Sequence, residues 1–161
     1  MARQWHVLEL RHLIPDDWPT WRAVRLEALR EAPQAFSSTL EAWQGPGDTE
    51  ERWRQRLEAV ALNVVAEVDG TAAGQVSGTA PDHGGTVELI SMWVDPSVRR
   101  RGVGAALVGE VVAWSAQQAG TAVRLAVREA NAPAIALYER CGFALTDVPA
   151  DGGERIMTRP L

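Results

Sequence analysis

The joint between a strand and a helix at residues 94–104 constrains the fold more than any other feature of the chain. Residues 86–94 are apolar enough to form a strand, and residues 103–119 repeat apolar positions at helical spacing. The first turn of a helix carries unpaired N–H groups at the positive end of the helix dipole. Gly102 and Gly104 would let a diphosphate approach without meeting a Cβ. An anion site is therefore predicted here, although a solvated basic turn before a helix fits the same residues.

Hydrophobic periodicity predicts a mixed α/β sheet in the order β-α-α-β-β-β-α-β-α-β-β. Asp69-Gly70 is a strong hairpin signal, and Asp48 with Glu51 has the spacing of a capping box. Asp16-Asp17-Trp18-Pro19 has the pattern of a helix start with a capping carboxylate. The predicted strands are residues 4–11, 63–68, 71–80, 86–94, 123–127, 143–148 and 154–158. The predicted helices are residues 16 to Pro33, 48–60, 103–119 and 131–140. An irregular connection is predicted over residues 35–47.

Composition narrows the function classes. The chain has 161 residues, which suits one domain over residues 1–161, and its net charge of −5 disfavours nucleic acid as a partner. All 16 basic residues are arginine, so no lysine can form a Schiff base. One cysteine, Cys141, excludes an intramolecular disulfide, and three scattered histidines give no metal-ligand spacing. Without a signal peptide or a membrane-spanning run, we expect a cytoplasmic protein.

Two motifs resemble those of a known family. Residues 99–104, Arg-Arg-Arg-Gly-Val-Gly, are similar to the Arg/Gln-x-x-Gly-x-Gly/Ala motif of the GNAT superfamily, in which many members have glycine where this chain has Arg100. Residues 131–143 resemble its Asn-x-x-Ala-x-x-Leu-Tyr-x-x-x-Gly-Phe element, one helix and one strand later. The resemblance is strong over residues 86–145. The first 85 residues match in element order and in a Leu-Arg-Glu-Ala-Pro-Gln-Ala-Phe stretch.

The resemblance implies a mixed, mostly antiparallel sheet with helices on both faces, and acetyl-CoA as cosubstrate. It places the pantetheine arm in the gap between the strand ending at Val94 and the strand starting at Val123, where a backbone N–H can stabilise an oxyanion. Asn131 would bind that arm or cap its own helix. The implied cofactor contacts are Met92, Trp93, Val94, Arg99, Arg100, Arg101, Gly102, Val103, Gly104, Ala105, Asn131, Ala134 and Tyr138.

Tyr138 and Glu88 are the candidate acid and base. The resemblance implies that Tyr138 protonates the leaving thiolate, whereas the residue pattern alone also fits a core aromatic. Glu88 lies in the strand before the turn, at a spacing where some family members place a general base; an ordinary edge carboxylate is the alternative. Without a bulge, alternation would put it on the side of Ile90, Met92 and Val94. His83 is a rival base, but its glycine-rich loop suggests a solvated side chain.

The expected reaction is direct acetyl transfer to an amine in a ternary complex, with no metal. A small-molecule amine is the favoured acceptor, because the chain is acidic and has no added domain. A protein N-terminus or lysine is the alternative, and a CoA-binding sensor without turnover is a second one. A monomer and a homodimer both stay open. The predicted acceptor pocket consists of Phe36, Trp43, Glu88, Trp93 and Glu154.

Overall fold

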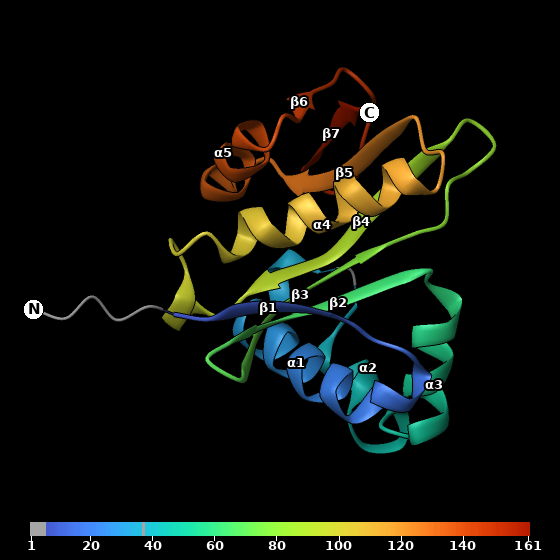
Figure 1. Cartoon of the computed structure of the whole chain (residues 1–161), viewed down its shortest axis with the longest axis vertical. Coiled ribbons are helices and arrows are strands. Elements are labelled where there is room, and N and C mark those ends of the chain that lie inside the picture. Colours follow the sequence, from blue (N-terminus) through green and yellow to red (C-terminus); the bar gives the residue numbers. More distant parts are fainter. Residues whose placement is uncertain (1–5, 37) are drawn as a thin grey trace, which may run out of the picture.

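A computed structural model describes residues 6–36 and 38–161. These residues form a seven-stranded sheet. Helices cover both faces of the sheet (Figure 1). The strand order is β1-β2-β3-β4-β5-β7-β6, and only β4 and β5 pair in parallel. This confirms the predicted mixed, mostly antiparallel fold. The strands are β1 Leu8–His12, β2 Leu62–Val68, β3 Thr71–Gly78, β4 Thr86–Val94, β5 Ala122–Arg128, β6 Ala144–Leu145 and β7 Glu154–Pro160; the helices are α1 Trp18–Glu31, α2 Leu40–Trp43, α3 Glu50–Ala59, α4 Val103–Gln117 and α5 Ala132–Arg140.

Most predicted elements are found with their ends shifted by a few residues, and two segments differ more. Residues 4 and 5 of the predicted first strand lie outside the described residues. The segment predicted as an irregular connection contains α2, because Thr39 Oγ1 accepts a hydrogen bond from Ala42 N and caps a short helix. The strand predicted at 143–148 pairs over two residues only, since the Thr146 hydroxyl bonds the Ile156 carbonyl and Val148 N turns back to that hydroxyl.

Two predicted capping carboxylates have other partners. Thr49, not Asp48, caps α3 by accepting from Arg52 N. Asp48 Oδ1 instead accepts from Arg22 Nε at 2.7 Å and from Trp53 Nε1 at 2.8 Å, so it joins α1 to α3. Asp17 Oδ2 accepts from Ile14 N before the helix. The Asp69-Gly70 turn has positive φ at both residues, as the hairpin prediction requires.

Each face of the sheet carries its own core. The helix α4 lies on one face, and α1, α2 and α3 lie on the other (Figure 1). The α4 face is aliphatic, with fully buried Val76, Leu107 and Val111 at its centre. The α1–α3 face is built around Trp21 and Trp53, both fully buried. One core is therefore mainly aliphatic, and the other is built around aromatic rings.

A bulge in β4 decides which side its residues face. Gln75 of β3 pairs with Trp93 while Ser77 pairs with Ile90, which leaves one extra residue in β4, and Ser91 there has φ 58°. Trp93 therefore joins the α1–α3 core, whereas Met92 and Val94 pack on the α4 core. The alternation expected in the absence of a bulge therefore stops at Ile90, and Met92 and Val94 face the side opposite to Glu88.

The strands β4 and β5 separate after a short paired stretch. They pair only from Thr86–Ala122 to Glu88–Arg124. Beyond that point β4 runs on to Val94 and β5 to Arg128, and no register between them is formed in the described part of the chain. On its other side β5 stays paired with β7 along its whole length. The sheet is therefore open between its two central strands.

Candidate functional site

A cleft of about 1750 Å³ fills the space where β4 and β5 separate. Its walls come from the end of α1 and the following turn, the free ends of β4 and β5, the first turn of α4, and α5. Typical ligand pockets measure about 300–1000 Å³. The cleft therefore has room for a large cosubstrate and a second molecule.

The first turn of α4 presents free N–H groups to this cleft. Gly102 is the N-cap with φ 81° and provides no side-chain cap, and the helix ladder starts with Ala106 N donating to the Gly102 carbonyl. By helix geometry the N–H groups of residues 103–105 have no partner within the helix. Arg100 also has a left-handed φ of 64°. A left-handed φ favours glycine, in agreement with the glycine that the resembled motif often has at this position.

The two glycines of the turn have different roles. A Cβ at Gly102 would meet nothing within 4 Å, so this position is open to a bulky ligand. A Cβ at Gly104 would lie 3.0 Å from Leu137 Cδ2 and 3.5 Å from Met92 Cε. Gly104 therefore allows α4 to pack closely against α5 and β4, in addition to any approach by a diphosphate.

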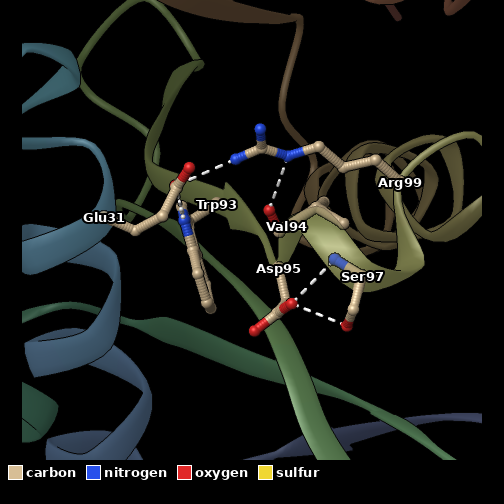
Figure 2. A network of polar contacts seen from close by, with 6 residues as sticks. All are labelled: Glu31, Trp93, Val94, Asp95, Ser97 and Arg99. Atoms are coloured by element: carbon tan, nitrogen blue, oxygen red, sulfur yellow. Dashed lines mark hydrogen bonds and ion pairs between the residues drawn. The ribbon is translucent and has the colours of Figure 1, made fainter.

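A polar network joins α1 to the end of β4 (Figure 2). Glu31 Oε2 accepts from Trp93 Nε1 at 2.8 Å and from Arg99 Nη2 at 2.9 Å. Arg99 Nε also donates to the Val94 carbonyl at 2.9 Å. The guanidinium of Arg99 thus lies across the end of the strand and fixes the α1 side of the cleft to the anion-binding turn.

Tyr138 of α5 lines the cleft and is 7% exposed. Burial raises the pKa of its phenol well above the usual value of 10, and Cys141 adds to the shift. The phenol is therefore protonated at any physiological pH. Asn131 Oδ1 accepts from Ala134 N and caps α5, as its sequence position suggested.

Glu88 and Trp43 lie outside the cleft lining. Glu88 forms an ion pair with Arg124 on the neighbouring strand, where β4 and β5 are still paired, and 43% of its side chain is exposed. Trp43 stacks on Trp53 with ring centroids 4.4 Å apart, and the Arg52 guanidinium lies 3.8 Å from the Trp43 ring centroid. Both side chains have local partners of their own, so neither position indicates contact with a ligand in the cleft.

Most of the other predicted residues line the cleft, and a few lie elsewhere. Arg101 faces a separate, smaller cavity beside His6 and Asp69, and Val103 is buried in the α4 core. The exposed loop of His83 lies apart from the cleft lining. The predicted residues that the cleft brings together are Phe36, Met92, Trp93, Val94, Arg99, Arg100, Gly102, Gly104, Ala105, Asn131, Ala134, Tyr138 and Glu154.

Sequence reasoning missed several residues of the cleft wall, among them Glu31, Ser91 and Arg128. Arg128 donates to the carbonyls of Gln34 and Gly152, which ties the end of β5 to the turn after α1 and to the start of β7. Glu31 falls within the Leu-Arg-Glu-Ala-Pro-Gln-Ala-Phe stretch, so that stretch was the available signal. Nothing in the sequence marked Ser91 as the site of a bulge.

Comparisons with known proteins agree with this architecture. Residues 15–143 match the model of the acetyltransferase (GNAT) family. A mycothiol acetyltransferase of Clavibacter michiganensis subsp. michiganensis is 31% identical over 137 residues, which are 84% of this chain. That alignment spans 42% of the relative, so the chain covers less than half of its curated relative's length.

Solved structures resemble the whole chain. The PaiA N-acetyltransferase of Thermoplasma acidophilum in complex with coenzyme A has a TM-score of 0.77 at 21% identity, covering 96% of this chain and 99% of that one. A GCN5-related N-acetyltransferase of Kribbella flavida has a TM-score of 0.73 at 25% identity, covering 96% and 98%. Within the described residues, no helix is long and apolar enough to cross a membrane, and no cluster of ligating side chains could hold a metal. The chain belongs to the GNAT family of acetyltransferases.

Proposed function

We propose that the protein is an N-acetyltransferase that moves the acetyl group of acetyl-CoA to the primary amine of a small molecule. The observation that carries the proposal is the single cleft in which free strand edges, an uncapped helix N-terminus and a buried phenol meet. Its size suits a cosubstrate and an acceptor together. The mycothiol acetyltransferase relatives, which are named for a small molecule, support a small-molecule acceptor.

The chain's own groups fit acetyl-CoA. The N–H groups at the start of α4 and the Arg100 side chain would bind the diphosphate, since Arg99 is already bonded to Glu31 and Val94. The unpaired backbone edges of β4 and β5 would bond the amide groups of the pantetheine arm, as a strand between them would. With the cosubstrate bound in this way, the thioester would lie near the β4 bulge and Tyr138.

The reaction is a direct transfer. The amine lone pair attacks the thioester carbon, a C–N bond forms and the C–S bond breaks. The hydroxyl of Tyr138 gives its proton to the departing sulfur, and the phenoxide is reprotonated from solvent. Because burial raises the pKa of Tyr138, its phenol is always in the acid form. How readily it gives up the proton depends on how closely the site matches the pKa of the phenol to that of the leaving thiolate.

The proton that leaves the amine needs an acceptor. Among the described residues, the carboxylates that line the cleft are Glu31 and Glu154, and Glu31 is held by two hydrogen bonds. Glu88 would act through water, because its carboxylate is paired with Arg124 outside the lining. The variants Glu88→Gln and Glu154→Gln distinguish deprotonation through water by Glu88 from deprotonation by Glu154. The variant that removes the base should lower turnover and move the pH–rate profile to higher pH. The other variant should leave the profile unchanged.

A screen of primary amines with acetyl-CoA, read by the release of free thiol, tests the proposed function. We expect turnover with at least one class of small amine. Peptides with free N-termini and lysine side chains form the second arm of the same screen. Binding of acetyl-CoA without thiol release in either arm would favour a CoA-binding sensor.

A further inference from the structure

Two arginines inside the α1–α3 layer form no ion pair with a carboxylate of the described residues. Arg25 is 7% exposed, and its pKa falls from 12.5 to about 10 because burial disfavours the charge and Arg56 repels it. Burial likewise lowers the pKa of Arg56 to about 10. Both stay protonated at neutral pH. Arg56 donates only to neutral oxygens, those of Asn63, Ser77 and Ser91. The surface arginines, by contrast, take part in many ion pairs.

Two N–H donors at these arginines make no hydrogen bond within the described residues. Arg25 Nη1 and Trp21 Nε1 are buried atoms with no hydrogen-bond partner among the described residues. They lie on the same face of α1, because residues four apart in a helix are neighbours. The Arg56 guanidinium carbon lies 5.1 Å from the Trp21 ring centroid. Trp21, Arg25 and Arg56 are here called the arginine cluster. It combines two positive charges with two N–H donors, Trp21 Nε1 and Arg25 Nη1, that have no acceptor among the described residues.

The arginine cluster lies directly behind the wall of the cleft. The Arg25 guanidinium carbon is 4.6 Å from the centroid of Phe36, whose ring lines the cleft. Arg56 bonds the hydroxyl of Ser91, which lines the cleft at the β4 bulge. One aromatic ring and one serine thus separate the cluster from the space beside the proposed thioester position. Phe36 was also among the residues predicted to line the acceptor pocket.

We propose that the arginine cluster binds a carboxylate of the acceptor, so that the substrate class is amino acids and related amines that carry a carboxylate. The inference rests on the proposed function and specifies its substrate. Buried charges without a partner are costly, and a carboxylate would supply both the opposite charge and the missing acceptors. Arg25 would reach it past the edge of Phe36, and Arg56 would keep its bonds to the β4 bulge.

The test compares amines that differ only by the carboxylate. Leucine and 3-methylbutylamine form one matched pair, and phenylalanine and 2-phenylethylamine another. We expect kcat/KM at least ~10-fold higher for the amino acid in each pair, about 1.4 kcal/mol. Arg25→Met keeps an unbranched stem and removes the charge, and should abolish this preference. Arg30→Met on the same helix is the control, because Arg30 is 65% exposed and pairs with Glu27 only; it should keep the preference.

A binding measurement separates failure of this inference from failure of the proposed function. Calorimetric titration with N-acetylleucine and with N-(3-methylbutyl)acetamide needs no turnover. We expect N-acetylleucine to bind at least ~10-fold tighter, in wild type and Arg30→Met but not in Arg25→Met. Equal binding of both compounds to wild type, or a preference that survives in Arg25→Met, overturns the inference. Displacement of N-acetylleucine by sulfate at equal concentration would show a general anion site and overturn it too.

Discussion

The two faces of the sheet solve different problems. On the α4 face, Val76, Leu107 and Val111 are fully buried, and the buried Ser115 hydroxyl donates to the Val111 carbonyl. On the α1–α3 face, polar groups are buried with their bonding incomplete: Trp21 Nε1, Arg25 Nη1 and Gln75 Oε1 all lack partners among the described residues. The α4 face is a mainly apolar core, and the α1–α3 face contains buried polar atoms without hydrogen-bond partners. The α4 face therefore supports the cleft with a core whose polar groups are bonded, whereas the α1–α3 face holds the unbonded polar groups on which the proposed acceptor site rests.

The largest change in the free energy of unfolding should come from the α4 face. Leu107→Ala removes a fully buried side chain that also fills the space left by Gly74. We expect the free energy of unfolding to fall by about 3 kcal/mol, measured by urea denaturation. Arg25→Met on the other face should cost nothing or stabilise the protein, because it removes an unpaired buried charge. Equal losses from both variants would contradict the division between the faces.

Tyr138 is the one member of the α4 core that we expect to take part in chemistry. Tyr138→Phe keeps the ring and its edge contact with Phe143, at a centroid distance of 6.0 Å, and removes the proton. Turnover should fall about 100-fold, near 2.7 kcal/mol, with the unfolding transition and acetyl-CoA affinity unchanged. Steady-state thiol release measures the effect. Normal turnover, where the chemical step limits the rate, would leave Tyr138 as a purely structural residue.

A smaller effect should distinguish the first turn of α4 from the middle of the helix. Gly104→Val places a branched side chain against Leu137 and Met92 at the cleft, whereas Gly109→Val on the same helix meets nothing within 4 Å. We expect the affinity for acetyl-CoA to fall at least ~10-fold, about 1.4 kcal/mol, in the first variant only. Calorimetry on both variants, after a check that each is folded, measures it. Equal affinities would move the cofactor site away from this turn.

The smallest effect concerns the joint between α1 and α3. Hydrogen bonds from Arg22, and then from Trp53, lower the pKa of Asp48 from 3.8 to about 2. A pKa lowered by folding stabilises the protein above the unfolded value, and this contribution is lost as pH falls from about 4 to 2. After allowance for solvent screening it amounts to no more than about 1 kcal/mol. Urea denaturation over this pH range should show the loss in wild type and not in Asp48→Asn; identical pH dependence would exclude it.

The sequence predicted the α4 side of the molecule better than the α1–α3 side. Residues 94–104 and 131–143 form local motifs, so their placement follows from contiguous residues. Glu88 was placed by alternation, and a single non-glycine residue, Ser91, reverses that alternation with no signal in its side chain. Arg25 was not singled out from the sequence, although it lies four residues after Trp21 and is buried on the same face of the helix. Burial of a charge depends on how distant elements pack, which local patterns do not encode.

The separation of β4 and β5 has a consequence for the lifetime of the protein. Strand edges that expose their N–H and C=O groups usually invite another chain, but these two face each other inside the sheet and line the cleft proposed to hold acetyl-CoA. A ligand that bridges them adds stability by mass action, about 2.7 kcal/mol at a hundredfold excess over Kd. When transient opening exposes the chain to proteases, resistance follows that free energy. The abundance of the protein would then follow the supply of the metabolite that fills the gap.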